Sequence, residues 1–146
     1  MIQPRQLRIG NFVEDLERNI LTVKAISESK ISVEENELKF SPNFINGIPL
    51  TYSTLISNDG FMPNDFPGFP DYKHLQRGDI IVRFSKSPEL HSVSIFKHLQ
   101  IELKTGEKTP VNLFLKRVRF VHEFQNAFVS LTGKELSLNK VDFQIG

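Results

Sequence analysis

The sequence of 146 residues contains no cysteine, which excludes a disulfide framework and any zinc or iron–sulfur site built on thiolates. A chain without cysteine suits a reducing compartment such as the cytoplasm. No apolar run approaches the roughly 18 residues that cross a membrane. The opening residues 1–5 also lack the apolar stretch of a secretory signal. We therefore expect a soluble, cytoplasmic chain with no membrane partner.

An excess of charge of either sign is also missing. Eighteen Lys and Arg stand against seventeen Asp and Glu, which gives a net charge of +1. Proteins dedicated to the phosphate backbone usually carry a clear basic excess, so this balance disfavours such a role. Tryptophan is absent, and thirteen Phe within a hydrophobic content of 39% supply the core instead. The length suits one domain, so we expect residues 1–146 to form a single domain.

Residues 7–45 show the period-two alternation of β-strands. Leu21, Val23 and Ala25 alternate with polar residues, and Ile31 and Val33 do so again after a polar turn at 27–30. Several short strands separated by turns predict a β-meander or a small SH3-like barrel.

The central part predicts a short helix and then a second β region. Thr51 can cap a helix that runs to Asn58. Alternation resumes from Ile80 and continues to residue 115, and the turn at 105–108 predicts a hairpin. Together with the closing helix described next, these elements predict an α+β fold.

A long helix is predicted from Val118 to Thr132, with Gly133 just past its end. At 100° per residue, one broad face is apolar and comprises Phe120, Val121, Phe124, Ala127, Phe128 and Leu131. A helix this apolar is mostly buried. Gln125 falls inside the apolar arc, where an amide is costly unless it is hydrogen-bonded, so we expect it to bond a neighbouring backbone.

Three blocks occur in a fixed order along the chain: LRIGNFV at 7–13, GIPLT at 47–51, and VHEFQN with LTGKEL at 121–126 and 131–136. This series resembles a family of small uncharacterised proteins encoded in phages and prophages of Bacteroidetes-type bacteria, which usually reads LRIGN, IPLT and VHQLQNLYFALTGEEL. The resemblance implies a phage or prophage origin and a shared fold, and it implies no activity.

One stretch comes close to a catalytic motif. The residues from His122 to Asn126 nearly match H-E-x-x-H, but Asn126 stands where the second zinc ligand belongs. Catalytic zinc needs three protein ligands, and the remaining histidines lack metal spacing to His122. We therefore expect no metal, no cofactor, no catalytic residues and no enzymatic activity.

Two groups of residues are candidates for binding. Arg119, His122 and Asn126 form a polar helix stripe that either recognises a partner or bridges to adjacent strands. Phe66, Phe69 and Tyr72 lie in the Pro-rich loop 61–72 and either anchor a partner protein or cover the local core.

The sequence thus favours a non-enzymatic accessory module that binds a protein partner. The alternative is a nucleic-acid-binding accessory protein. It would use the basic cluster at residues 116–119, whose Lys116, Arg117 and Arg119 could contact phosphates.

Overall fold

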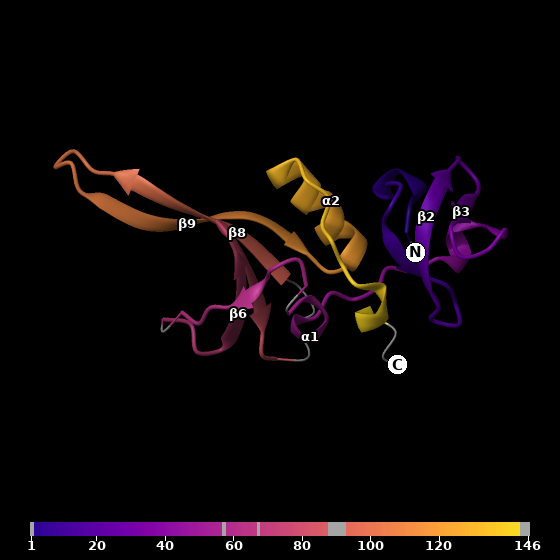
Figure 1. Cartoon of the computed structure of the whole chain (residues 1–146), viewed down its shortest axis with the longest axis horizontal. Helices are drawn as coiled ribbons and strands as arrows, with labels where there is room; N and C mark the ends of the chain where they lie inside the picture. The colour runs from indigo at the N-terminus through magenta and orange to yellow at the C-terminus, as the bar shows by residue number, and fades with distance from the viewer. Residues whose placement is uncertain (1, 57, 67, 88–92, 144–146) are drawn as a thin grey trace. The chain divides into compact units, whose positions relative to one another are not determined.

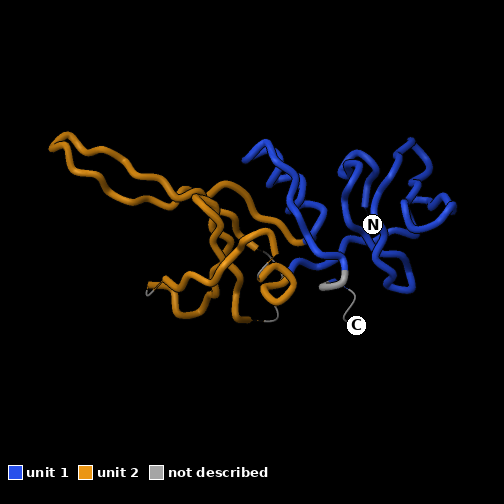
Figure 2. The backbone as a smooth tube through the Cα atoms, in the orientation of Figure 1, with its two compact units in different colours: residues 1–50, 120–146 blue, residues 51–119 orange. Residues whose placement is uncertain are grey.

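The computed structural model describes residues 2–56, 58–66, 68–87 and 93–143. The predicted α+β class is confirmed, with one antiparallel sheet of four strands and one of five. The chain divides into two compact units (Figure 2). Unit 1 comprises residues 1–50 and 120–146, and unit 2 comprises residues 51–119. Unit 2 is therefore an insertion between two segments of unit 1, and the single domain remains a prediction.

Unit 1 contains the predicted meander, with strands in the order β1-β2-β3-β4 (Figure 1). Its elements are η1 (Pro4–Gln6), β1 (Phe12–Glu14), β2 (Ile20–Ile26), β3 (Ile31–Val33), β4 (Lys39–Phe40), η2 (Pro42–Phe44), α2 (Val121–Thr132) and η3 (Lys140–Phe143). Val13, Val23 and Ile31 are fully buried within it, because alternate side chains of each strand face inward. An isolated antiparallel bridge joins Glu14 to Asn46.

Helix α2 begins at Val121, three residues later than the sequence predicts. The reason is that the preceding strand continues to Val118 and a bridge then pairs Pro49 with Phe120. Phe124 and Phe128 are both 1% exposed, in agreement with the helical periodicity. Leu131 is also expected on the buried face, but it is 37% exposed because it lies in the last turn of the helix.

Gln125 is buried and makes the backbone bonds that the sequence predicts. Its Oε1 accepts from the backbone N–H of Phe12 at 2.8 Å, and its Nε2 donates to the carbonyl of Gly10 at 3.2 Å. The helix amide thereby joins α2 to the beginning of β1. Gly133 ends the helix at a φ of 71°, a left-handed conformation that glycine adopts without strain.

Unit 2 is built on a sheet of order β5-β6-β7-β8-β9. Its elements are α1 (Tyr52–Leu55), β5 (Met62–Pro63), β6 (Tyr72–Arg77), β7 (Ile80–Ser85), β8 (Val93–Glu102) and β9 (Lys108–Val118). Helix α1 starts at the predicted cap, where the Thr51 hydroxyl accepts from the Thr54 amide, but it ends at Leu55 rather than Asn58. Among the helices that the structure describes, none is long and apolar enough to cross a membrane.

The core of unit 2 lies on one face of this sheet. Leu75, Val82 and Ile95 are directly paired across β6, β7 and β8, and all three are fully buried. Leu55 and Phe61 are also fully buried. Residues paired across an antiparallel sheet share a face, so the core face can be followed from strand to strand through the register.

Candidate functional site

Strands β8 and β9 extend beyond the rest of their sheet. β7 pairs with β8 only from Val93 to Lys97, whereas the β8–β9 pairing continues from there to Glu102 and Lys108. Figure 1 shows this two-stranded ribbon projecting past β6. We call residues 97–113 the arm. A two-stranded hairpin on its own is only marginally stable in water. The arm therefore has little support beyond its own strand pairing.

One face of the arm is apolar. Leu99, Ile101, Val111 and Leu113 share this face through the register, together with Lys97 and Thr109. With Leu103, which follows the end of β8, these four leucine, isoleucine and valine residues form what we call the apolar stripe. Ile101, Leu103 and Leu113 are 47%, 44% and 49% exposed. The stripe continues the face that carries Ile95, so the apolar pattern of the core persists where the side chains are accessible to solvent. Exposed apolar patches of this kind mark interaction sites.

The arm and its base are basic, in contrast to the balanced chain. Residues 93–119 contain two acidic residues, Glu102 and Glu107, and six basic ones, Lys97, Lys104, Lys108, Lys116, Arg117 and Arg119. Lys116 and Arg117 of the predicted basic cluster are exposed on β9. Residues 116–118 thus form the end of β9, and Arg119 follows that strand.

The other face of the same sheet carries an arginine held by aromatic rings. The Cζ atom of Arg83 lies 4.1 Å from the ring centre of Phe69, 4.4 Å from that of Phe96 and 5.3 Å from that of Tyr72. Its Nε–H donates to Nε2 of His74 at 2.9 Å. We call these residues, together with Phe66, the arginine cluster.

His74 is the buried centre of the arginine cluster, at 1% exposure. Burial, the largest cause, and the positive charge of Arg83 together lower the pKa of its imidazole to about 4, while Asp65 acts in the opposite direction. The ring is therefore neutral at pH 7, and since Nε2 accepts a hydrogen bond, the proton resides on Nδ1. Nδ1 is buried and has no hydrogen-bond partner among the described residues.

The predicted aromatic anchors gather in this cluster. Phe66 is partly buried and packs edge-on against His74, with ring centres 4.7 Å apart. Phe69 and Tyr72 are 42% and 37% exposed, and their rings lie 6.5 Å apart. This placement is compatible with both interpretations of the loop, as a cover for the core and as an anchor for a partner. Phe66 covers buried structure, whereas Phe69 and Tyr72 leave aromatic surface accessible.

The predicted helix stripe has a different placement. The Asn126 side chain accepts from Arg8 Nε at 3.1 Å and from Asn11 Nδ2 at 2.8 Å, and it donates to the Gln6 carbonyl at 3.0 Å. These bonds join α2 to the segment that runs from η1 to the start of β1.

His122, the second residue of that stripe, is buried at 3% exposure. Its ring stacks on Phe120 at 5.8 Å, and burial lowers the pKa of the imidazole. Arg119, the third residue, is exposed at the end of unit 2. The stripe is therefore divided by the late start of α2.

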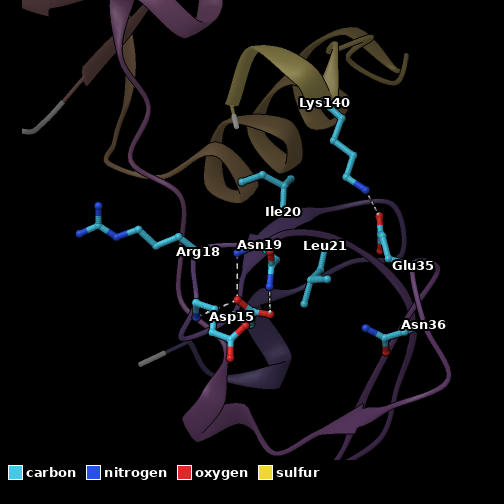
Figure 3. Close-up of a pocket in the computed structure, with 9 residues that line it drawn as sticks. Asp15, Arg18, Asn19, Ile20, Leu21, Glu35, Asn36 and Lys140 are labelled. Carbon is cyan, nitrogen blue, oxygen red and sulfur yellow. Dashed lines mark hydrogen bonds and ion pairs between the residues drawn. The ribbon is translucent and has the colours of Figure 1, made fainter. Parts of the chain in front are cut away.

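A polar hollow of about 710 Å³ lies in unit 1 (Figure 3). The Oδ1 atom of Asp15 accepts from the amide of Asn19 at 2.9 Å. Glu35 accepts from the Thr22 amide at 2.7 Å and from Lys140 Nζ at 2.6 Å. These carboxylates hold the turns around them.

The residues that the structure describes contain no group of three or more His, Cys, Asp or Glu side chains arranged to bind a metal.

Sequence reasoning missed Arg83 and His74 as partners, although their side chains are joined by a hydrogen bond of 2.9 Å. The register of β6 and β7 pairs them directly, which no local pattern in the sequence reveals.

Comparison with protein families, curated proteins and solved structures gives no match to the chain. The residues themselves define two surfaces on opposite faces of one sheet, the apolar stripe and the arginine cluster.

Proposed function

We propose that this chain is a non-enzymatic module that binds a partner protein through the apolar stripe of the β8–β9 arm. One observation carries the proposal: Ile101 and Leu113 are each nearly half exposed on the continuation of a core face, and Leu103, just after β8, is 44% exposed. Following the resemblance of its sequence, we also propose that it is a cytoplasmic phage or prophage accessory protein.

The energetics of the apolar stripe favour a protein partner. Full burial of an aliphatic side chain from water contributes roughly 1.5–3 kcal/mol. The exposed parts of Ile101, Leu103 and Leu113 together could therefore contribute about 3 kcal/mol on docking. Docking would also cover one face of a two-stranded ribbon that has little support of its own.

The charges around the stripe indicate the chemistry of the partner. Lys97 and Lys116 lie on the face of the stripe at its base, since they pair with Leu113 and Ile95. Lys104 and Lys108 are exposed near the tip. An apolar surface with an acidic rim is complementary to this pattern, and such complementarity increases association rate and specificity more than affinity.

The first unit supports a finer structural proposal. The two backbone bonds of the Glu14–Asn46 bridge, at 3.0 and 2.8 Å, return the chain after β4 to the outer edge of β1. A four-stranded meander that curls back in this way is consistent with a small SH3-like barrel. We include this barrel in the proposal for unit 1.

Site-specific cross-linking tests the proposed surface. A photoreactive amino acid is placed at Leu113 in one variant and at Gln100 in another, because Gln100 is exposed on the opposite face of the arm. We expect a discrete protein adduct in the native host with the probe at Leu113 and none at Gln100. Equal adducts at both positions would contradict the proposal.

Charge substitutions supply the matched test of affinity. Leu113→Asp should abolish capture of the cross-linked protein, whereas Gln100→Asp adds the same charge and should preserve it. Both positions are solvent-accessible, so both variants should keep the melting temperature of the parent. Concentration-dependent dimerisation that Leu113→Asp abolishes would instead identify a second copy as the occupant.

A second candidate, nucleic-acid binding, is favoured by a different observation. Residues 93–119 carry six basic and two acidic side chains on a two-stranded ribbon, and the major groove of DNA admits such a ribbon. An exposed apolar stripe is of no use against phosphates, so we rank this candidate second.

A further inference from the structure

We infer that Arg83 is the centre of an oxyanion-binding site that takes a carboxylate or phosphate group. The inference is independent of the proposed protein partner, because it concerns the opposite face of the sheet. Its ligand is defined by the chemistry of a guanidinium, which bonds two oxygens at once through parallel N–H groups.

The first argument is that the charge of Arg83 has no counter-ion. Arg83 is partly buried, and burial lowers the pKa of its guanidinium. Within the described part of the chain, no carboxylate lies within ion-pair distance of it. Charges withdrawn from water in proteins are normally paired, so a bound anion would supply the partner that the described residues do not give this partly buried charge.

A comparison with Arg77 of the same sheet strengthens the argument. The Nη1 atom of Arg77 lies 3.2 Å from a carboxylate oxygen of Asp59, so its charge is satisfied within the chain. Arg83 has aromatic rings and a neutral imidazole in place of a carboxylate. Rings attract a cation through their quadrupoles but do not neutralise it.

The second argument is that the guanidinium is held in one orientation before any ligand arrives. Nε is bonded to His74, and the rings of Phe69 and Phe96 lie within 4.4 Å of Cζ. The four remaining N–H donors are on the two Nη atoms. A fixed donor pair loses less entropy on binding than a free arginine does, and this is the advantage of preorganisation.

The register adds a second cation and a hydroxyl to this face. Ser94 pairs with Arg83 on one side and with Arg117 on the other. Neighbouring strands are about 4.8 Å apart, so two long guanidinium side chains flank a short serine. Arg117 is exposed, which leaves it able to approach an anion bound at Arg83.

The test is a nuclear magnetic resonance titration of the full chain that follows the Nε–H signal of Arg83. Sodium acetate and sodium phosphate are the probes, and sodium chloride at equal ionic strength is the reference. We expect a saturable shift with at least one oxyanion and none with chloride. Saturation by acetate identifies a carboxylate site, saturation by phosphate alone identifies a phosphate site, and either result supports the inference.

Matched variants assign the effect to the residue. Arg83→Lys keeps the charge but loses the paired donors, so the affinity measured on the neighbouring Phe96 and Ser94 amides should fall about fivefold or more. Arg77→Lys should leave it unchanged. Phe69→Ala removes an exposed ring and should weaken binding without unfolding the chain, which keeps the test valid if Arg83→Lys does not fold. Equal shifts in chloride, or affinity retained in both Arg83→Lys and Phe69→Ala, would overturn the inference.

Discussion

Arg83 donates its Nε–H to Nε2 of His74 across the β6–β7 pair, and this bond fixes both the charge and the tautomer of a buried imidazole. A protonated His74 has no lone pair to accept that bond and would place a second positive charge beside the guanidinium. The stability of unit 2 is therefore linked to pH through the ring of His74.

The first prediction concerns this pH dependence. The pKa of His74 is about 4 when folded and about 6.5 when unfolded, so the unfolded chain binds more protons between these values. By linkage, the free energy of unfolding falls as the pH is lowered through this window. Between pH 7 and pH 5 we expect His74 to account for a loss of about 2 kcal/mol, measured by chemical denaturation.

The control for this prediction is His74→Gln, which keeps a neutral side chain with an acceptor for Arg83. Its loss between pH 7 and pH 5 should be clearly smaller than that of the parent. Burial also lowers the pKa of His122, so part of the dependence should remain in the variant. Identical pH profiles for parent and variant would show that His74 is not buried in its neutral form.

The second prediction concerns the packing of α2. Phe128 is 1% exposed, so Phe128→Ala should leave a cavity and lower the free energy of unfolding by roughly 3–5 kcal/mol. Leu131→Ala is the matched control, because Leu131 is 37% exposed in the same helix and should lose far less. A Phe128→Ala melting temperature within a degree of the parent's would refute the described packing.

The third prediction concerns Gly47. A Cβ atom at this position would lie 2.7 Å from Cγ of Phe120, the residue before α2, and 3.0 Å from Cε1 of His122 in its first turn. Gly47→Ala should therefore destabilise the chain by about 1–3 kcal/mol through overpacking. Gly68→Ala has open space around it and serves as the control. Thermal melting of the two variants decides the matter, and equal melting temperatures would contradict the close approach.

The fourth prediction addresses nucleic acid. Each phosphate neutralised on duplex DNA contributes about −0.9 to the salt slope, so three contacts from Lys116, Arg117 and Arg119 give a slope near −3. We expect binding to duplex DNA to be no tighter than about 10 μM at physiological salt. Fluorescence anisotropy measures it. Sub-micromolar binding that disappears in Arg117→Ala/Arg119→Ala would replace the protein-binding proposal with its alternative.

The sequence by itself determined those features that depend on the periodicity of one element. The buried positions of Phe124 and Phe128, the backbone bonds of Gln125 and the existence of the hairpin follow from local spacing and from the cost of burying an unpaired amide. The hairpin connection itself spans residues 103–107 rather than 105–108. The α+β class follows from the same patterns taken in order. In each case, the information lies within about a dozen neighbouring residues.

Only the tertiary structure decided which elements meet. Periodicity shows that Arg83 and His74 each face one side of a strand, but the strand register places them opposite each other and brings Phe96 alongside. Strands β8 and β9 extend beyond β7, and this is likewise a property of the pairing. It leaves the apolar stripe accessible to solvent. Both candidate surfaces arise from contacts between strands, which depend on the whole sheet rather than on any one segment of the chain.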